Sequence, residues 1–384
     1  MHILHVISSL DPAEGGPPVV VTRLGAAQEM RGHDVDVLAH AETSARERID
    51  SMITSLPGNG LLNVHLLEPG GPIERVRARQ ARTWLREHVE AYELVHLHGV
   101  WDPILHNAAR EARRTGTDWI ITPHGMLDPW CMDQGRLRKR LALAFRGQNM
   151  LEGSRFIHAL NRDEEAGMKP HVGAATIEVI PNGIFLEEIE PLPERGTFRE
   201  SRRELDDEPF VLFLSRLHYK KGLDILVSAF EQVHARVPEL RLVIAGPDDG
   251  YESTLHTIIE ASSARSNIHC IGPVYGTDKL AALVDCDCFC LPSRQEGFSM
   301  AITEALGCGT PVVITEACHF PEVAEAGAGL VTPLDPEAVG QAMHEVVSST
   351  DARSRMGSAG AALVREHYTW PAIAARLDTA LGLE

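Results

Sequence analysis

Two glutamates stand eight positions apart where a short apolar run gives way to a helical pattern: Glu296 and Glu304. The run Cys288–Leu291 predicts a buried strand closed by Pro292, and the apolar spacing after Gly297 predicts a helix. Glu296 then lies where the strand meets the helix, and Glu304 lies further along it. The first N–H groups of a helix lack partners within the helix and attract phosphate. Carboxylates beside such donors suit a ligand with hydroxyls and a diphosphate, such as a nucleotide sugar.

Two cations follow an earlier strand-like run. Arg216 and Lys221 lie in the segment after the run at 210–214. A guanidinium fork and an ammonium point charge together can neutralise a diphosphate. The alternative is a solvated, charged loop with no ligand.

Two histidines occupy equivalent places in the first half of the chain. His98 and His124 each follow a strand-like run, and each is followed by a glycine. Residues just past parallel strands face the ligand cleft of such sheets, so we expect both side chains there. Packing in the core is the alternative reading for a single histidine.

Gly15 and Gly16 lie between the first apolar run and the first helical segment. Glycines there let the backbone approach a ligand closely, although a plain flexible turn remains the alternative. The spacing is not G-x-G-x-x-G, so a nicotinamide dinucleotide site has little support.

Metal and cofactor sites are not expected. Cys286, Cys288 and Cys290 alternate along one strand, where side chains stand in a row rather than converging on a tetrahedral ion. We interpret these cysteines, and Cys308, as small buried hydrophobes. No Asp-x-Asp metal site is evident at a strand end, so no obligatory divalent ion or cofactor is predicted. Seven cysteines, an odd number, indicate reduced cytosolic thiols.

The elements that must position these residues follow from the alternation of apolar runs and helical segments. In the first half, strands are expected at 2–8, 35–39, 64–67, 94–97, 119–122 and 156–160. After a pause at 179–184 they restart at 210–214, 241–245, 268–271, 286–291 and 311–314, and a last helix is expected at 370–383. The pattern predicts two doubly wound α/β domains, 1–183 and 184–368, with a ligand cleft at their strand ends.

Charge and composition exclude several classes. The 384 residues carry a net charge of -18, with -3 in 1–183 and -15 in 184–384, which argues against general nucleic-acid binding. No apolar run is long enough to span a membrane, and the N-terminus reads as a strand rather than a signal peptide. Two local basic clusters are either solvated helix faces or sites for an anionic membrane surface or a diphosphate lipid. Their members are Arg75, Arg77, Arg79, Arg82, Arg86 and Arg136, Arg138, Lys139, Arg140, Arg146.

These residues together resemble the retaining glycosyltransferases of family 4, which have the GT-B fold. The strongest marks are Arg216 five positions before Lys221, and Glu296-Gly297-Phe298 with Glu304. Weaker marks are the glycine pair 15–16, the segments 179–183 and 307–313, and the tail 367–370. The resemblance implies two Rossmann-like domains facing across a cleft, with residues 369–384 forming a helix that packs back on the first. The segment 123–130 is similar to a subset acting in bacterial surface-polysaccharide assembly.

The resemblance also implies roles for named residues. Arg216 and Lys221 would hold the donor diphosphate, Glu296 the sugar hydroxyls and Glu304 the ribose. Donor contacts would also come from Gly15, Gly16, Val274, Gly297, Phe298, Ser299 and Met300. His124 would join Arg216, Lys221 and Glu296 in catalysis, and His98, Trp101 and Asp128 are assigned to the acceptor side.

The predicted reaction is glycosyl transfer with retention, from a nucleoside-diphosphate sugar to a glycan or lipid-linked acceptor. The family is usually assigned a front-face mechanism, so Glu296 is not predicted to be a covalent nucleophile. A nucleotide-sugar epimerase and a catalytically silent nucleotide-sugar-binding subunit are the alternatives. The expected location is the cytoplasm, with peripheral attachment to the inner membrane face if the basic clusters bind lipid.

Overall fold

A computed structural model describes residues 1–58, 62–71, 74, 77–133, 139, 142–143, 147–202, 205 and 208–383. The chain forms two compact units. Unit 1 comprises Met1–Asn182 and Trp370–Glu384, and unit 2 comprises Gly183–Thr369. The expected boundary near 183 lies next to this division. The chain enters and leaves unit 2 at one place, because the N–H of Ile184 donates to the carbonyl of Tyr368 at 2.9 Å.

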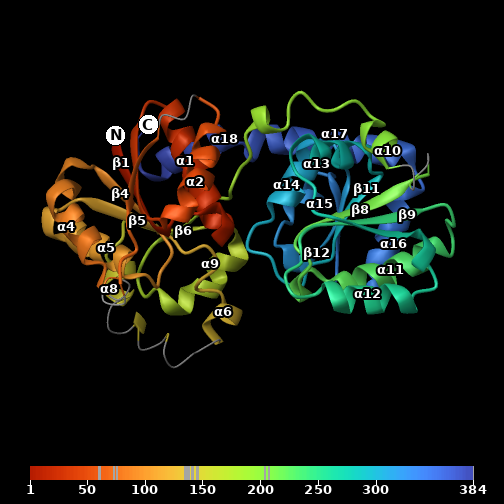
Figure 1. Ribbon diagram of the computed structural model, residues 1–384, viewed down its shortest axis with the longest axis horizontal. Helices are drawn as coiled ribbons and strands as arrows, with labels where there is room; N and C mark the ends of the chain where they lie inside the picture. The colour runs from red at the N-terminus through yellow and green to blue at the C-terminus, as the bar shows by residue number, and fades with distance from the viewer. Residues whose placement is uncertain are drawn as a thin grey trace. The chain divides into compact units, whose positions relative to one another are not determined.

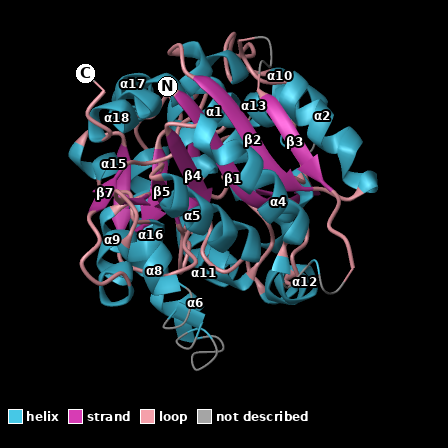
Figure 2. Ribbon diagram, turned by 90° about the vertical axis from the view of Figure 1, so that its left-hand side faces the viewer, coloured by secondary structure: helices cyan, strands magenta, loops and turns pink. Residues whose placement is uncertain are grey.

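Unit 1 is built on a parallel sheet of seven strands, in the order β3-β2-β1-β4-β5-β6-β7. Figure 2 shows β3 toward one edge and β7 toward the other. The order reverses at β1, from which the chain builds outward in both directions, as in doubly wound folds. The strands are β1 (His2–Ser9), β2 (Asp34–His40), β3 (Asn63–Leu67), β4 (Leu94–His98), β5 (Asp118–Thr122), β6 (Ile157–Ala159) and β7 (Ile177–Val179).

Helices cover both faces of this sheet, with α1 and α2 on one side and α4 and α5 on the other (Figure 1). The bounds are α1 (Gly16–Met30), α2 (Arg46–Thr54), α4 (Arg79–His88), α5 (Pro103–Thr115), α6 (Pro129–Asp133), α8 (Gln148–Glu152), α9 (Arg162–Met168) and α18 (Trp370–Ala380). The last helix, α18, packs against α1. Asp378 is 3% exposed and accepts from Arg31 Nε at 2.5 Å and contacts His33 Nε2 at 3.0 Å, which ties the C-terminal segment to unit 1.

Unit 2 repeats the plan with six parallel strands, in the order β10-β9-β8-β11-β12-β13. The strands are β8 (Phe210–Leu214), β9 (Arg241–Ala245), β10 (Ile268–Gly272), β11 (Cys288–Leu291), β12 (Val312–Thr315) and β13 (Gly329–Thr332). The helices are α10 (Thr197–Ser201), α11 (Leu223–His234), α12 (Glu252–Ala261), α13 (Gly276–Asp285), α14 (Met300–Gly307), α15 (Glu322–Glu325), α16 (Pro336–Val347) and α17 (Thr350–His367). Helices α11, α12 and α16 cover one face, and α13 and α14 lie on the other (Figure 1).

Every strand expected from the apolar runs is present, within two residues at most ends. Two short edge strands, β7 and β13, were not expected. β7 falls at the pause before the domain boundary, where three paired residues leave too short a periodic signal. Helix α14 begins at Met300, so Phe298 and Ser299 precede it rather than forming its first turn.

The expected reading of the cysteines as packing residues agrees with their burial. Cys286, Cys288, Cys290 and Cys308 are at most 7% exposed and belong to the apolar core of unit 2. Burial raises the pKa of these thiols, which disfavours the reactive thiolate. Within the described residues, none of the helices combines the length and hydropathy that crossing a bilayer requires.

Candidate functional site

The predicted donor-binding residues of unit 2 converge at one point of the sheet. Strand order changes direction between β8 and β11, and ligands of open α/β sheets bind outside the strand ends at such a point. β8 ends at Leu214 and leads to Arg216 and Lys221, whereas β11 ends at Leu291 and leads to Glu296. The cations and the glutamate therefore leave the two strands that flank this switch point.

Lys221 and Glu296 make the central contact. Lys221 Nζ donates to Glu296 Oε1 at 2.6 Å, and Ser293 Oγ donates to the same oxygen at 2.6 Å. The side chains of Lys221 and Glu296 are only 13% and 8% exposed, so screening by water is weak. Within the part of the chain that the structure describes, Glu296 Oε2 has no hydrogen-bond partner. That oxygen is free to accept from a ligand hydroxyl.

A glycine fixes the approach of the two loops. Gly222 follows the 3₁₀ turn Tyr219–Lys221 with φ of 68°, and a Cβ there would lie 1.9 Å from the carbonyl oxygen of Pro292. Only glycine combines this left-handed backbone with the space available. Because Lys221 and Ser293 directly adjoin these two residues, the close approach brings the lysine to Glu296.

The second glutamate has its own lysine. Lys279 Nζ donates to Glu304 Oε1 at 2.8 Å, and these side chains are 26% and 19% exposed. Arg216 is different, because it pairs with Asp249 at 2.8 Å on the surface, where the two side chains are 65% and 41% exposed. An exposed pair of this kind contributes little free energy, so Arg216 can exchange Asp249 for an anionic ligand.

The remaining donor-side residues surround the start of α14. Phe298 packs its ring against Phe320 and Tyr368, with centroids 5.8 and 6.2 Å apart. Ser299 is the residue before the helix, and its carbonyl accepts from the N–H of Thr303. The helix donors that lack an intrahelical partner therefore start at Met300. Val274, after β10, is 7% exposed, and Gly297 is exposed between Glu296 and the helix.

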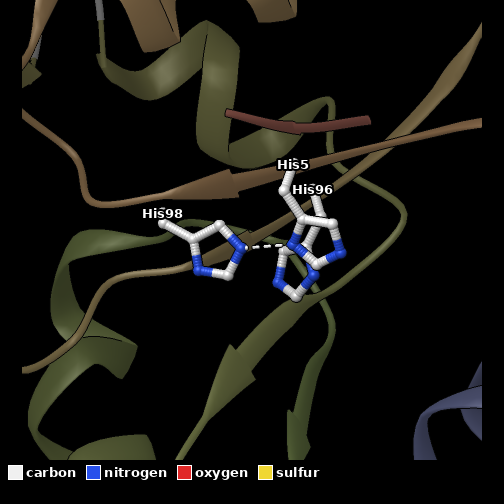
Figure 3. Close-up of side chains that lie close together, drawn as sticks. All are labelled: His5, His96 and His98. Carbon is white, nitrogen blue, oxygen red and sulfur yellow. Dashed lines mark hydrogen bonds between the residues drawn. The ribbon is translucent and has the colours of Figure 1, made fainter. Parts of the chain in front are cut away.

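Unit 1 presents neutral groups at the corresponding point of its sheet, between β1 and β4. His5 Nδ1 lies 2.8 Å from His98 Nε2, and His98 Nδ1 lies 3.0 Å from His124 Nε2. At the other end, His5 Nε2 lies 2.7 Å from Gln28 Oε1 on α1. Figure 3 shows the ring of His98 pointing at His5, with His96 beside them. These four residues form one continuous hydrogen-bonded row, which we call the histidine chain: Gln28, His5, His98 and His124.

Burial keeps the histidine chain uncharged. It lowers the pKa of His5 to about 4 and the pKa of His98 well below its ordinary range. His124 retains some exposed surface, yet the protein around its ring lowers its pKa to about 3. A second row lies beside the chain, in which Thr122 Oγ1 is 2.7 Å from His96 Nε2 and 3.0 Å from His158 Nδ1.

A metal ion is the other use of such a cluster. Ligand atoms of His5, His96 and His98 lie within 4.8 Å of one another, and His96 Nδ1 is buried without a hydrogen-bond partner among the described residues. Tetrahedral zinc with bonds of about 2.0–2.1 Å needs nitrogens roughly 3.3 Å apart. His5 Nδ1 and His98 Nε2, at 2.8 Å, are spaced for a shared proton instead. The arrangement therefore fits a hydrogen bond better than a metal.

Backbone strain marks His124. Its φ is 52°, in the left-handed region that a non-glycine residue rarely adopts. The turn is held by Glu164, which is 7% exposed and accepts from the N–H of Gly125 at 2.7 Å and that of Leu160 at 2.6 Å. Burial raises the pKa of this carboxyl group. Strain of this kind is typical of residues held for a function.

The remaining residues of unit 1 that were predicted to contact donor or acceptor do not form one cluster. His98 is 2% exposed, so it stands behind His124. Gly15, with φ of 120°, and Gly16 have open space where a Cβ would be. Trp101 lies beneath the ammonium of Lys139, 5.6 Å from the ring centroid, and the N–H of Asp128 donates to the carbonyl of Gly125.

Sequence reasoning missed Ser293, Lys279, His5, Gln28 and Glu164. Ser293 could have been found, since it lies three residues before Glu296 on the same loop. The others lie on separate elements and read as ordinary strand or helix residues. Of the second basic cluster, Arg136, Arg138, Arg140 and Arg146 lie outside the described residues, as does Arg75 of the first.

Two family models account for most of the chain. The model described as glycosyl transferase 4-like domain matches residues 15–183, and the model described as glycosyl transferases group 1 matches residues 194–362. The chain belongs to glycosyltransferase family 4. The two doubly wound units are those of the GT-B fold of this family. The family membership does not favour the epimerase or the silent subunit.

Two curated relatives are glycosyltransferases, and a solved structure shares the fold. The chain is 30% identical over 219 residues to a GDP-mannose-dependent monoacylated alpha-(1-6)-phosphatidylinositol monomannoside mannosyltransferase of Corynebacterium glutamicum, a match that covers 54% of the chain and 57% of that relative. It is 26% identical over 410 residues to a D-inositol 3-phosphate glycosyltransferase of Xylanimonas cellulosilytica, covering 95% and 91%. The crystal structure of Anabaena HepE in complex with UDP superposes with a TM-score of 0.80, at 19% identity and full coverage of both chains.

Proposed function

We propose that this protein transfers a sugar, with retention, from a nucleoside-diphosphate sugar to a phosphate-bearing lipid or glycan acceptor. The observation that carries the proposal is the contact between Lys221 and Glu296 at the switch point of unit 2. It joins a cation suited to phosphate with a carboxylate suited to hydroxyls at one point of the sheet.

The proposed donor roles are those that the family resemblance implies, and the geometry of unit 2 is compatible with each. Lys221 and Arg216 neutralise the leaving diphosphate, and the N–H groups at the start of α14 add fixed dipoles. Glu296 accepts from sugar hydroxyls through its unoccupied Oε2. Glu304, on the second turn of α14, accepts from the ribose. The loss of one such contact in the transition state costs about 3–4 kcal/mol.

The reaction exchanges one bond for another at the anomeric carbon. The bond from that carbon to the diphosphate oxygen breaks, the bond to the acceptor oxygen forms, and the acceptor proton passes to the leaving phosphate. In this proposal Glu296 acts as an orienting group rather than a nucleophile, as the front-face mechanism usually assigned to the family implies, and Lys221 and Ser293 hold its Oε1 in place. In this proposal no divalent ion is required.

Two observations support a phosphate-bearing acceptor. The curated relatives named above act on a phosphatidylinositol mannoside and on an inositol phosphate. The basic residues of α4 are suited to an anionic membrane surface that presents such a lipid. Peripheral attachment at the cytoplasmic face of a membrane is part of the proposal.

A donor screen tests the function. The protein is incubated with several nucleoside-diphosphate sugars, with and without lipid extract, and free nucleoside diphosphate is measured together with any interconverted sugar. Nucleotide release that depends on the extract supports transfer. Interconverted sugar without release identifies an epimerase, and bound donor with no turnover identifies a silent subunit.

A further inference from the structure

A pocket of about 600 Å³ opens between α4, α5 and α8 of unit 1. Among the described residues that line it, arginine is the most frequent type and no carboxylate is present. In a chain with a net charge of -18, this is a strong local excess of positive charge. We call it the arginine pocket and define it by Arg77, Arg79, Arg82, Arg110 and Arg113.

Two of these arginines are held in place by the protein. The guanidinium of Arg113 donates to the carbonyl of Asn149 and lies over the ring of Trp119, 5.5 Å from its centroid. Arg82 Nε is 3.5 Å from Glu111 Oε1, whose other oxygen binds Arg114 at 2.9 Å. These contacts build one wall of the pocket without a ligand.

The other three arginines are exposed. Within the described part of the chain, Arg77, Arg79 and Arg110 make no side-chain hydrogen bond or ion pair. The backbone that carries Arg77 is fixed, because Asn107 Nδ2 donates to the carbonyls of Arg77 and Ala78 at 3.0 and 3.1 Å. Three cations are thus presented into one pocket without an acidic partner.

We propose that the arginine pocket binds a phosphate group, carried by a lipid headgroup or by a soluble phosphate. Guanidinium forks match the oxygens of phosphate and can bind it in pairs. The site is separate from the donor diphosphate site, because all of its residues lie in unit 1. The proposal deepens the proposed acceptor class but does not need the reaction to occur.

Inorganic phosphate binding, measured by calorimetry at low salt, tests the pocket. The double variant Arg79→Gln/Arg110→Gln should bind about tenfold or more weakly, since each 1.4 kcal/mol is a factor of ten. Arg86→Gln, an exposed arginine of α4 outside the pocket, is the matched control and should bind as wild type. Lys221→Ala separates the two sites, because it affects only phosphate at the donor site.

Unchanged phosphate binding in the double variant overturns the proposal, and so does complete loss of binding in Lys221→Ala alone. Vesicles of zwitterionic lipid with and without phosphatidic acid distinguish the sources. Binding of such vesicles that is lost in the double variant assigns the site to a lipid headgroup. Phosphate binding without vesicle binding assigns it to a soluble ligand.

The histidine chain carries a second, independent inference. A neutral imidazole has one N–H and one lone pair, so each ring in the chain donates once and accepts once. With Gln28 Oε1 as acceptor, His5 Nε2 carries a proton, and His5 Nδ1 accepts from His98 Nε2. His98 Nδ1 then accepts from His124 Nε2. His124 Nδ1 is left with a lone pair and no partner among the described residues.

We infer that Gln28, His5 and His98 are positioning residues that decide which ring nitrogen of His124 carries the proton. The chain is all-or-none, because reversing the amide of Gln28 would reverse every hydrogen bond and turn His124 Nδ1 into a donor. Within the part of the chain that the structure describes, Gln28 Nε2 is buried without a partner, so this residue contacts the histidine chain through its other amide atom, Oε1. In the orientation observed, His124 Nδ1 accepts a hydrogen bond from a ligand hydroxyl.

Nitrogen-15 NMR of the full-length protein, labelled at histidine, tests the inference without requiring activity. The wild type should show His124 as the single tautomer with the proton on Nε2. Gln28→Glu, whose carboxylate can only accept, should keep that tautomer, whereas Gln28→Leu should give a mixture. His96→Gln is the matched control, because His96 is buried 4.1 Å from the ring of His98 but lies outside the chain.

Three outcomes overturn the inference: a wild-type His124 protonated on Nδ1, an unchanged tautomer in Gln28→Leu, or zinc-dependent shifts of the His5 and His98 signals. The last outcome would assign the cluster to a metal. If transfer activity has been detected, Gln28→Leu should lower kcat more than it raises KM, and Gln28→Glu should restore it.

Discussion

The two units share one strand order yet present opposite chemistry at the same topological point. In unit 2, the loops that follow the strands at the switch point carry charged side chains, with the largely buried pair of Lys221 and Glu296 at the centre. In unit 1, the corresponding strands carry buried histidines that burial keeps neutral. Charged groups there suit a diphosphate, and neutral groups suit hydroxyls.

The fold determines where functional side chains are placed, but it does not determine which ligand they bind. Both sheets aim residues outward from their central strands, but side-chain type and depth decide what is bound. In the buried histidine chain only the direction of the hydrogen bonds can change, so the gain or loss of one proton alters the whole chain. A largely buried ion pair is sensitive to the removal of either charge.

The largest effect is expected from Glu296→Gln in unit 2. The amide cannot hold the Lys221 ammonium or accept from sugar hydroxyls as strongly, so turnover should fall about 10²–10³-fold, with nucleotide affinity largely kept. Turnover is followed by release of nucleoside diphosphate, and affinity by calorimetry. Glu304→Gln is the control, and it should weaken nucleotide binding more than turnover. Wild-type turnover in Glu296→Gln would remove the residue from the proposed site.

Gly222→Ala should destabilise unit 2 more than unit 1. The added Cβ would meet the Pro292 carbonyl at 1.9 Å, at a φ of 68°, so the free energy of unfolding should fall by about 3 kcal/mol. Gly250, with φ of 83° and open space around it, is the matched control, and its alanine variant should lose only about 1 kcal/mol. Hydrogen exchange measures the loss of stability in unit 1 and unit 2 separately. Equal losses in both variants would mean that the close approach carries no cost.

Lys221→Ala should weaken the binding of nucleoside diphosphate more than that of nucleoside, by about tenfold or more, because a charge-assisted contact to phosphate is lost. Lys220→Ala changes the same charge one residue earlier and should have the smaller effect. Titrations of both ligands measure the ratio. Equal losses for nucleoside and nucleoside diphosphate would contradict a phosphate role.

The smallest effect is expected from a change of pH, which should lower the free energy of unfolding of unit 1. His5 and His158 have folded-state pKa values of about 4, below the ordinary 6.5, because burial disfavours the charged ring. The unfolded chain therefore binds protons first, so stability is full above about pH 6.5 and is lost as the pH falls toward 4. Each histidine contributes roughly 1 kcal/mol per pH unit in that window.

Hydrogen exchange at pH 7.5 and 5.0 compares the two units directly. Protection should fall more in unit 1 than in unit 2, because His5 and His158, whose burial disfavours the charged ring, both lie in unit 1. His158→Gln should reduce the pH dependence of unit 1. A parallel decline in both units would show that carboxylates, and not these histidines, control acid sensitivity.

Much of the fold and part of the candidate site were predictable because they depend on local patterns. Apolar runs marked the central strands, and Arg216, Lys221 and Glu296 could be read from strand ends on which parallel topology must converge. The start of α14 was misplaced by two residues because Phe298 is apolar and fits a helical pattern, whereas its ring packs against Phe320 and Tyr368.

The sequence alone determined the order of elements, the switch points and the residue types placed there, since periodicity and strand ends are properties of neighbouring residues. Only the tertiary structure decided the partners. Gln28, His5, His98 and His124 come from four separate elements, and no local pattern records that their rings align within hydrogen-bond distance. The same holds for Lys279 beside Glu304. Partner choice depends on packing between elements distant in sequence, and that packing sets both burial and protonation.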